Sequence, residues 1–412
     1  MSPLRLFRLS SLRAFFRKGF GPSGGKGGLK GSKPLVLLAY LMIVGVFLWV
    51  LSSFYIPGKG FTYFVFFGDK QPPVISDLQK VDHYVREDPG YDGQFYVQIA
   101  IDPTLRNPEL RTSIDNLPYR ARRILTSGIA YVMGGGKPER ILHAYTLLSP
   151  IAWFALAALL LFWFPPTSWS NWFRWSGVLF TSGMWTSVLR ALSDCPSLLL
   201  VAIGVFLFER RRPFLATLVL AVSGLAKETN ILGATLFARR ESVLSPRQWP
   251  VLILRGALIL APLVLWLLYI EKVVGLAGSG GGGNFSWPFV GWAKQVVALW
   301  CGAFFNEASD FSFQLTPFRC LLGVLALTVQ FIYLVVRPQW ESAWWRVGIT
   351  FALLMAVIGD AVWEGDANIA AFRVLLPMQL AFNVLVPYSR RWWPVLVMGN
   401  LSLLTELYTI LF

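Results

Sequence analysis

A short run of acids, amides and tyrosines carries the residue types that acid–base chemistry needs. It reads Tyr91-Asp92-Gly93-Gln94-Phe95-Tyr96, and Asp102-Pro103 follows it. If this stretch forms a helix, Asp92 shares one face with Phe95 and Tyr96, and that face can rest on a bilayer. A carboxylate beside aromatic rings and away from bulk water can act as the general base for a sugar hydroxyl. The alternative is structural, because Asp-Gly is common in turns and aspartate often caps a helix.

A basic cluster closes the same polar segment. It consists of Tyr119, Arg120, Arg122 and Arg123, directly before the apolar stretch that begins at Ile124. Arginines on the outer side of a membrane run against the usual bias of basic residues toward the cytoplasm. A bound phosphate would explain them, since the guanidinium fork matches phosphate oxygens. Contact with lipid headgroups, or pairing with the acids of the segment itself, explains them equally well.

Further ionisable residues interrupt apolar sequence downstream, where each needs a partner or a wet cavity. Lys227 and Glu228 join two short apolar stretches, so they either serve a site or pair with each other and close a hairpin. Arg373 stands one turn into an apolar run and can pair with nearby acids or with a ligand phosphate. The remaining candidates flank turns in the sequence: Asp102, Arg190, Asp194 (which can simply cap a helix) and Glu364.

The elements that must position these residues are membrane helices. The 412 residues are 55% hydrophobic and only 14% charged, whereas soluble domains carry about 25% charge. Apolar runs long enough to span a membrane recur, and the alternation of a β-barrel is absent. The net charge of +15 does not indicate nucleic-acid binding, because the basic residues form short clusters beside apolar runs.

Two histidines and three unpaired cysteines indicate no disulfide framework and no histidine-ligated metal. No cofactor is therefore certain. A divalent metal remains possible if Asp92 meets Asp82, Asp88 or Asp194 in space, which the spacing alone does not decide.

The apolar runs predict an all-α, polytopic bundle of about eleven spans. Residues 1–33 form a basic cytoplasmic tail, expected to be disordered, and residues 34–412 form one integral membrane domain. Residues 57–123 are the first external loop and 272–316 the second, while 124–133 is too short to cross. The predicted spans are 34–56, 141–164, 175–190, 194–209, 213–225, 228–238, 250–271, 317–336, 345–361, 369–387 and 392–411. With this topology every basic cluster after the tail lies in the cytoplasm, except the one at 120–123.

Taken together, these motifs resemble a bacterial family of multi-pass proteins linked to cell-surface glycopolymer formation, and more broadly the GT-C superfamily of membrane glycosyltransferases. The motifs that carry the likeness are Tyr-Asp-Gly-Gln-Phe-Tyr at 91–96, Asp102-Pro103, Tyr119-Arg120, Arg122-Arg123-Ile124-Leu125, Ala226-Lys227-Glu228-Thr229 and Arg373-Val374-Leu375-Leu376-Pro377. The resemblance implies a catalytic acid in the first external loop, a lipid-phosphate-linked sugar donor and inversion at the anomeric carbon. The tandem acidic pair of classical members is missing, since Gly93 follows Asp92, and so is the long carboxy-terminal soluble domain of some members.

Asp92 is accordingly the expected catalytic residue. The residues expected to bind the donor and its phosphate are Tyr96, Tyr119, Arg120, Arg123, Lys227, Glu228 and Arg373. The predicted function is transfer of a sugar from a polyprenyl-phosphate donor to a cell-surface glycan or lipid acceptor, at the outer face of a bacterial inner membrane. The partners are then the donor, the acceptor and membrane lipids. The alternatives are a flippase for lipid-linked glycans, although no clear internal repeat supports a transporter, and a non-catalytic subunit of glycopolymer assembly.

Overall fold

The chain folds almost entirely into helices. The computed structural model describes residues 33–275, 283–305, 312–364 and 369–403. Helix accounts for 72% of it, and the strands among the described residues are β1 (Phe67–Gly68) and β2 (Val85–Arg86), paired in parallel with Phe67 opposite Val85. The predicted all-α class is confirmed.

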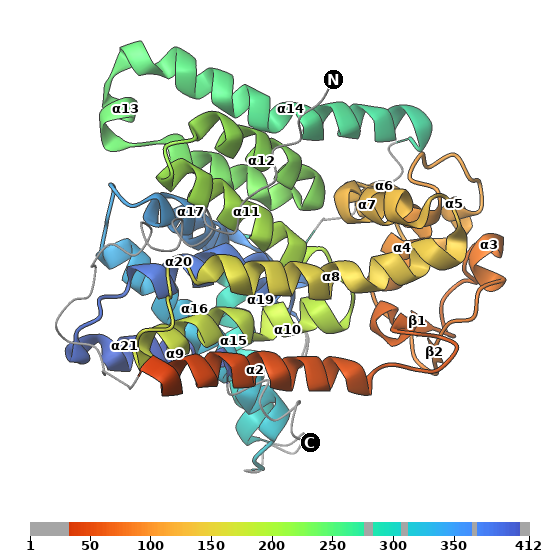
Figure 1. The fold of residues 1–412 in the computed structure, drawn as a ribbon, viewed down its shortest axis with the longest axis horizontal. Coiled ribbons are helices and arrows are strands. Elements are labelled where there is room, and N and C mark those ends of the chain that lie inside the picture. The colour runs from red at the N-terminus through yellow and green to blue at the C-terminus, as the bar shows by residue number, and fades with distance from the viewer. Residues whose placement is uncertain (1–32, 276–282, 306–311, 365–368, 404–412) are drawn as a thin grey trace, which may run out of the picture.

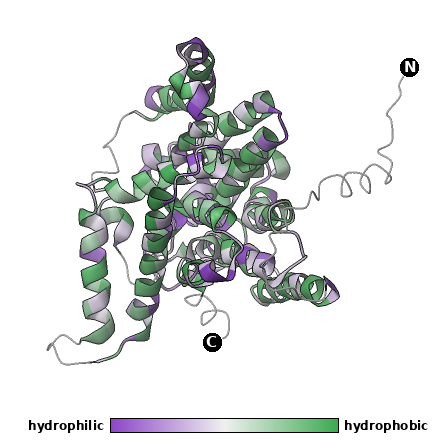
Figure 2. Ribbon diagram, turned by 90° about the vertical axis from the view of Figure 1, so that its left-hand side faces the viewer, coloured by the Kyte–Doolittle hydropathy of each residue, from purple (hydrophilic) through white to green (hydrophobic). Residues whose placement is uncertain are grey.

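Four helices are long and apolar enough to cross a membrane. They are α2 (Lys33–Ser53), α8 (Pro138–Leu160), the stretch Pro246–Val273 that contains η3 (Pro246–Gln248) and α14 (Trp249–Val273), and α16 (Leu315–Val336). Only 28% of the apolar window in α2 and 11% of that in α14 is buried inside the protein. Their outer faces expose leucine, isoleucine and valine side chains, and Figure 2 shows how strongly hydrophobic residues predominate along the helices. Such contiguous apolar faces suit a hydrocarbon environment.

The predicted count of about eleven spans is not confirmed, because several predicted spans are short or broken. The run at 175–190 is divided between α9 (Trp169–Leu179) and α10 (Ser182–Leu189), where Thr181 Oγ1 accepts a hydrogen bond from the Met184 N–H and starts a new helix. The run at 369–387 is divided between α19 (Ala370–Val374) and α20 (Leu376–Leu385), with Pro377 in the first turn of α20. The run at 228–238 forms a 3-10 helix, η2 (Glu228–Phe237).

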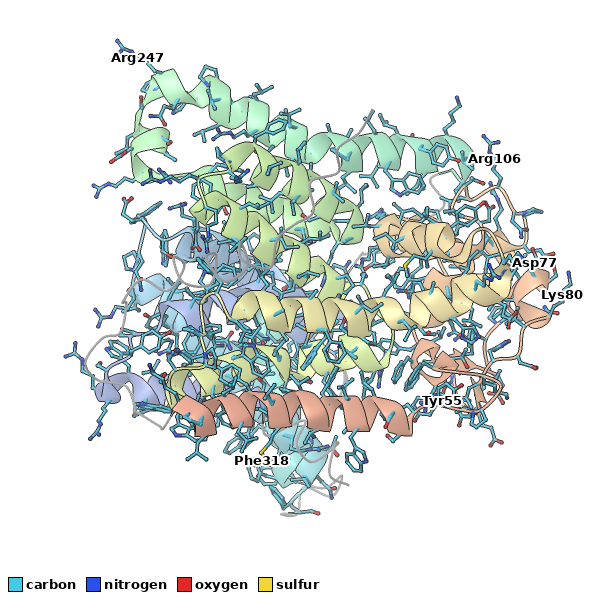
Figure 3. The ribbon with its side chains drawn as sticks, viewed as in Figure 1. Tyr55, Asp77, Lys80, Arg106, Arg247 and Phe318 are labelled. Atoms are coloured by element: carbon cyan, nitrogen blue, oxygen red, sulfur yellow. The ribbon has the colours of Figure 1, made fainter. Side chains whose placement is uncertain are left out.

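The polar segment that follows α2 folds into short helices at one end of the bundle. These are η1 (Thr62–Val65), α3 (Ser76–Gln79), α4 (Gly93–Ile101), α5 (Leu110–Ser113), α6 (Leu117–Ala121) and α7 (Ile124–Gly134). In Figure 1 they lie together at the right, whereas α13 (Arg240–Leu244) lies at the opposite end. Figure 3 likewise shows Asp77 and Arg106 at one end and Arg247 at the other. The stretch after Tyr91 is a helix, and the apolar stretch at 124–133 forms the short helix α7.

An aromatic cluster attaches α2 to the rest of the bundle. The Phe47 ring in α2 stacks on Trp153 in α8, with centroids 3.7 Å apart, and meets Trp185 of α10 edge-on. The Tyr40 hydroxyl donates to the Phe164 carbonyl at 3.0 Å. Large buried rings of this kind contribute much of the packing energy of a core, so α2 is held along one face and leaves the other exposed.

Three elements run from the polar end of the bundle to the end that carries α13. They are α11 (Asp194–Glu209), α12 (Pro213–Ala226) and η2, which pack on one another. Helix α14 covers α12, and at the polar end its Trp266 Nε1 donates to the Ala121 carbonyl at 2.8 Å. The remaining elements are α15 (Val290–Phe304), packed on α16, then α17 (Ala343–Val357), packed on α20, and α18 (Asp360–Trp363), η4 (Arg390–Trp392) and α21 (Trp393–Met398).

Some predictions fall outside the described residues. The basic tail at 1–33 does so except for Lys33, which begins α2. The second loop at 272–316 is described only in part, without 276–282 and 306–311. The last predicted span, 392–411, is described to residue 403.

Candidate functional site

Helix α4 forms the floor of the candidate site, and it is buried on all sides rather than on one. Residues 93–100 are all buried, including Gln94 and Gln98. Gln94 Oε1 accepts from the Gly68 N–H and Gln98 Oε1 from the Ile75 N–H, both at 3.1 Å. The expectation that one face of this helix rests on the bilayer is therefore wrong, because Phe95 and Tyr96 on that face are buried inside the protein.

Asp92 lies at the start of α4. It belongs to the partly exposed rim of the site, which consists of Tyr91, Asp92, Arg120, Arg123 and Arg190. Its side chain is 22% exposed and caps no backbone N–H, so the helix-cap alternative does not describe it. Its Oδ1 lies 2.9 Å from Nη1 of Arg120. Arg120 also holds Asp115 through two contacts, of 3.0 and 2.7 Å. Burial acts to lower the pKa of Arg120, but the hydrogen bond to Asp115 and the charge of Asp92 outweigh it and raise that pKa above its ordinary value.

Arg123 connects α4 with the junction of α12 and η2. Its Nη1 donates to the Tyr96 hydroxyl at 2.9 Å, and its Nε donates to Glu228 Oε2 at 3.2 Å. Burial raises the pKa of the Tyr96 phenol, which remains a neutral acceptor for Arg123. The Tyr119 ring lies beside Arg120, Arg122 and Arg123, with guanidinium-to-centroid distances of 5.5–5.6 Å. Pairing with the acids of the segment itself holds for Arg120, whereas Arg123 pairs with Glu228, which lies outside that segment.

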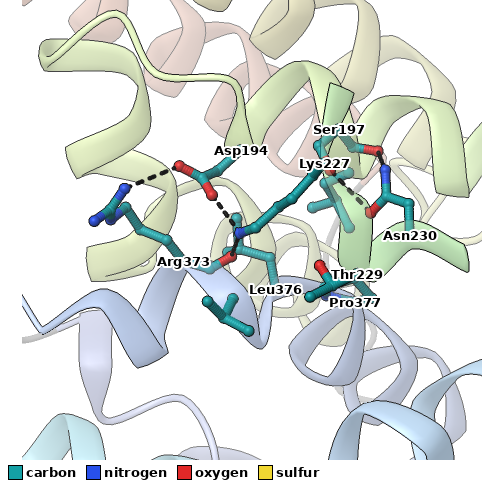
Figure 4. Close-up of a pocket in the computed structure, with 10 residues that line it drawn as sticks. Asp194, Ser197, Lys227, Thr229, Asn230, Arg373, Leu376 and Pro377 are labelled. Carbon is teal, nitrogen blue, oxygen red and sulfur yellow. Dashed lines mark hydrogen bonds and ion pairs between the residues drawn. The ribbon is translucent and has the colours of Figure 1, made fainter. Parts of the chain in front are cut away.

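Asp194 is the centre of a second, buried group of charges (Figure 4). Lys227 Nζ donates to Asp194 Oδ1 and also to the Arg373 carbonyl at 3.2 Å, and Arg373 Nη1 lies 3.4 Å from Asp194 Oδ2. The three side chains are 4%, 5% and 10% exposed for Asp194, Lys227 and Arg373. Lys227 thus pairs with Asp194 and not with its neighbour Glu228, and Asp194 binds two cations rather than capping α11. Both simpler alternatives are wrong.

Tyr91 joins this buried group to the rim. Its hydroxyl accepts from Arg373 Nη2 at 3.1 Å, and the Arg190 guanidinium stacks 4.2 Å from its ring centroid. Arg190 also lies 4.9 Å from the Phe66 ring, and Arg86 of β2 lies 3.5 Å from that ring. Sequence reasoning missed Arg86, because an isolated arginine in a loop carries no signal until the fold places it.

Arg86, Arg190 and Arg373 carry more hydrogen-bond donors than the described residues around them accept. Within the described ranges, neither Arg86 nor Arg190 forms an ion pair with a carboxylate. In these arginines, three buried nitrogens have no hydrogen-bond partner among the described residues, namely Nε and Nη2 of Arg86 and Nε of Arg373, and Thr229 Oγ1 has none either. Because buried polar groups are normally paired, these unpaired donors set the site apart from an ordinary buried cluster.

Two glycines allow the elements to approach closely enough to assemble the site. A Cβ atom on Gly93 would lie 2.6 Å from the Arg190 carbonyl oxygen, and one on Gly183 would overlap the backbone at Phe372. The glycine after Asp92 is therefore required by close packing. Between Arg190 and Asp194, Ala191 adopts a left-handed conformation with φ of 45°, which is rare for a residue with a side chain. Local strain of this kind accompanies the turn that aims both residues into the site.

The buried group is closed. The gap lined by Asp194, Lys227, Thr229, Asn230 and Arg373 is nowhere wide enough for a water molecule. A ligand therefore does not fit in this gap, whereas Tyr91, Asp92, Arg120, Arg123 and Arg190 at the rim are all partly exposed. The rim brings together a carboxylate that can accept a proton and basic groups that can bind an anion.

Two candidates lie apart from this arrangement. Asp102 organises its own turn, since its oxygens accept from the backbone of Thr104, Arg106 and Asn107. Glu364 is exposed at the end of α18, and Asp366 lies outside the described residues. Among the described residues there is no group of three or more His, Cys, Asp or Glu side chains that can hold a metal ion.

Comparisons with protein-family models, with characterised proteins and with solved structures found no match for this chain.

Proposed function

We propose that this chain is a membrane glycosyltransferase that moves a sugar from a polyprenyl-phosphate donor to a glycan or lipid acceptor. The observation that carries the proposal is the meeting of Arg190 and Arg373 at Tyr91, next to Asp92 in the chain, with Arg86 on the neighbouring Phe66 ring. Of these arginines, Arg86 and Arg373 have buried donors without acceptors among the described residues. Guanidinium groups bind phosphate through paired hydrogen bonds, and Arg190, which is partly exposed and forms no ion pair among the described residues, offers its donors at the rim.

The donor phosphate would bind at the rim against Arg190 and the Tyr91 side of Arg373. Lys227 and Arg123 would contribute positive potential from behind, because Asp194 and Glu228 already hold them in place. Charge that grows on the leaving phosphate is then met by groups already oriented toward it. Electrostatic stabilisation of this kind supplies much of the rate enhancement of many enzymes.

Asp92 would act as the general base. As the acceptor oxygen bonds to the anomeric carbon, its proton passes to the Asp92 carboxylate. The bond from that carbon to the phosphate oxygen breaks, and its electron pair leaves with polyprenyl phosphate. The Asp92 side chain is 22% exposed, so an acceptor can reach it from the rim.

The setting is consistent with a donor that is dissolved in a membrane. Four apolar helices of spanning length belong to the bundle, and α4, which follows Asp92, lies at one end of it. We propose the finer topology on sequence grounds: a cytoplasmic amino terminus, about eleven crossings with the short and broken helices included, and a bacterial inner membrane. The likeness to the GT-C superfamily favours the same reaction.

The test is turnover by the purified full chain in liposomes that contain synthetic polyprenyl-phosphate sugars and envelope glycans as acceptors. Release of polyprenyl phosphate and formation of a glycosidic bond are measured together. Asp92→Asn is expected to lower turnover at least about 100-fold, the usual contribution of a general base. Arg190→Gln is expected to weaken donor binding about tenfold, through loss of one charge-assisted hydrogen bond.

Asp77→Asn is the matched control, because this carboxylate lies in the same polar segment, exposed and paired only with Lys80 among the described residues. Each variant is first compared with the parent in its thermal unfolding midpoint. Movement of the donor across the bilayer without release of polyprenyl phosphate would replace the enzyme by a flippase. Full activity in Asp92→Asn would remove the proposed base.

A further inference from the structure

A second arginine cluster lies at the opposite end of α11 from Asp194. Arg211, Arg239 and Arg255 line a cavity of about 530 Å³ together with Phe208 and Phe237. Asp194 and Phe208 are fourteen residues apart on α11, which corresponds to about 21 Å of helix. The two sites are therefore separate, and whatever reaction the first performs, the second needs its own explanation.

The arginines of this cavity lack acidic partners. No acidic residue is among the described residues that line it, and none of its three arginines forms an ion pair within the described ranges. Arg239 and Arg255 instead stack at 4.9 Å on the rings of Phe208 and Phe237, respectively. Arg255 stands in the second turn of an apolar helix of spanning length. A cation inside such a helix is costly unless it pairs or faces a wet cavity.

The walls of the cavity combine charge with apolar surface. Ser242 adds a hydroxyl, while the two phenylalanines and Pro213 offer apolar contact. Along α14, Val251, Ile253 and Leu254 are exposed beside Arg255. A ligand that satisfies both features carries a phosphate group and an acyl chain, and basic pockets between membrane helices commonly bind such headgroups. The volume lies within the range of ligand sites, about 300–1,000 Å³.

We infer that this cavity binds the phosphate headgroup of an anionic phospholipid, with Arg211, Arg239 and Arg255 on the phosphate and the acyl chains along α14. The arginines at this end of the bundle then bind a ligand in addition to orienting the chain in the membrane.

The experiment measures the thermal unfolding midpoint of the full chain in detergent by tryptophan fluorescence. Three probes are titrated at matched ionic strength: dihexanoyl phosphatidylglycerol, dihexanoyl phosphatidylcholine and inorganic phosphate. Phosphatidylglycerol is expected to raise the midpoint in a saturable way, as a ligand of the folded state does. Phosphatidylcholine is expected to leave it unchanged, and inorganic phosphate to act at least about tenfold more weakly because it lacks acyl chains.

The double variant Arg239→Gln, Arg255→Gln is expected to weaken phosphatidylglycerol binding at least about tenfold, since two charge-assisted contacts are lost. The matched control is Arg390→Gln, Arg391→Gln, which removes two exposed arginines from η4 and is expected to bind as the parent does. Equal weakening in both double variants would show a diffuse charge effect and overturn the site. Equal affinity for inorganic phosphate and phosphatidylglycerol would overturn the assignment to a lipid.

Discussion

The two ends of α11 use basic residues in different ways. At the Asp194 end, Lys227 and Arg373 share one buried carboxylate, and Arg123 is held by Glu228. At the other end, Arg211, Arg239 and Arg255 face a cavity without a carboxylate on its described walls. Both ends are basic, yet among the described residues only the cations named at the first end form ion pairs with carboxylates.

The difference separates two ways of making an anion site. Internal carboxylates fix the position of each cation before any ligand arrives, which favours chemistry that depends on orientation. A cavity of unpaired arginines is less ordered and depends on an external anion for neutrality, which favours binding of a mobile amphiphile. The first arrangement should therefore be sensitive to single substitutions and the second tolerant of them.

The largest expected effect follows from removing the shared carboxylate. Asp194→Asn leaves Lys227 and Arg373 buried without a counter-charge, which costs about 3–5 kcal/mol of unfolding free energy. Denaturant unfolding in detergent measures the loss. Asp115→Asn is the control, because that carboxylate is 41% exposed and should contribute less than about 1 kcal/mol. Equal losses in the two variants would mean that the buried group is not preorganised by Asp194.

Removing one of the two buried cations should cost less. In Lys227→Met, Asp194 keeps its contact with Arg373, so the loss is that of one charged hydrogen bond, about 1.5–3 kcal/mol. The same denaturant unfolding measures it. A loss above that of Asp194→Asn would indicate that Lys227, and not the carboxylate, organises the group.

Close packing at the site also stabilises the fold, by an amount comparable to that expected for Lys227. In Gly183→Ala the added methyl group meets the backbone beside Arg373 and should destabilise the fold by about 1–3 kcal/mol. Gly128→Ala in α7 is the matched control, because nothing lies within 4 Å of its added methyl group, and it should be neutral or stabilising. Similar behaviour of the two variants in denaturant unfolding would show that the approach of α10 to α19 is not tight.

The smallest effect is expected at the opposite end. Arg255→Gln should change the unfolding free energy by no more than about 0.5 kcal/mol in detergent without phospholipid, because no internal ion pair is lost among the described residues. The measurement is the same denaturant unfolding. A loss as large as that of Lys227→Met would erase the contrast between the two ends.

Much of the residue inventory of the site is predictable from the sequence, but its pairing is not. The types and places of Asp92, Arg123, Lys227 and Arg373 mark them as unusual in apolar surroundings. Their partners are far away in the chain: Asp194 is 33 residues from Lys227 and 179 from Arg373. The adjacent residues Lys227 and Glu228 suggest an ion pair that does not form. The α-helix α12 is followed by the 3-10 helix η2 at this point, and the two side chains bind different partners.

Helix content is likewise predictable, whereas helix length is less so. Apolar composition identifies α2, α8, α14 and α16 as possible spans, because hydropathy over about 20 residues is a local property. Thr181 and Pro377 mark the divisions locally, but the breaks also accommodate the packing of neighbouring elements. Gly183 shows why, since it lets α10 approach α19 where both runs are broken.

By itself, then, the sequence determined that this chain is helical and apolar and that it keeps a few charged groups where charge is expensive. Only the tertiary structure decided that the charged groups form an ion-paired cluster at one end of α11. At the other end, arginines without ion pairs among the described residues line a cavity. The physical reason is distance: solvation and helix formation depend on neighbours along the chain, whereas an ion pair depends on which segments meet in space.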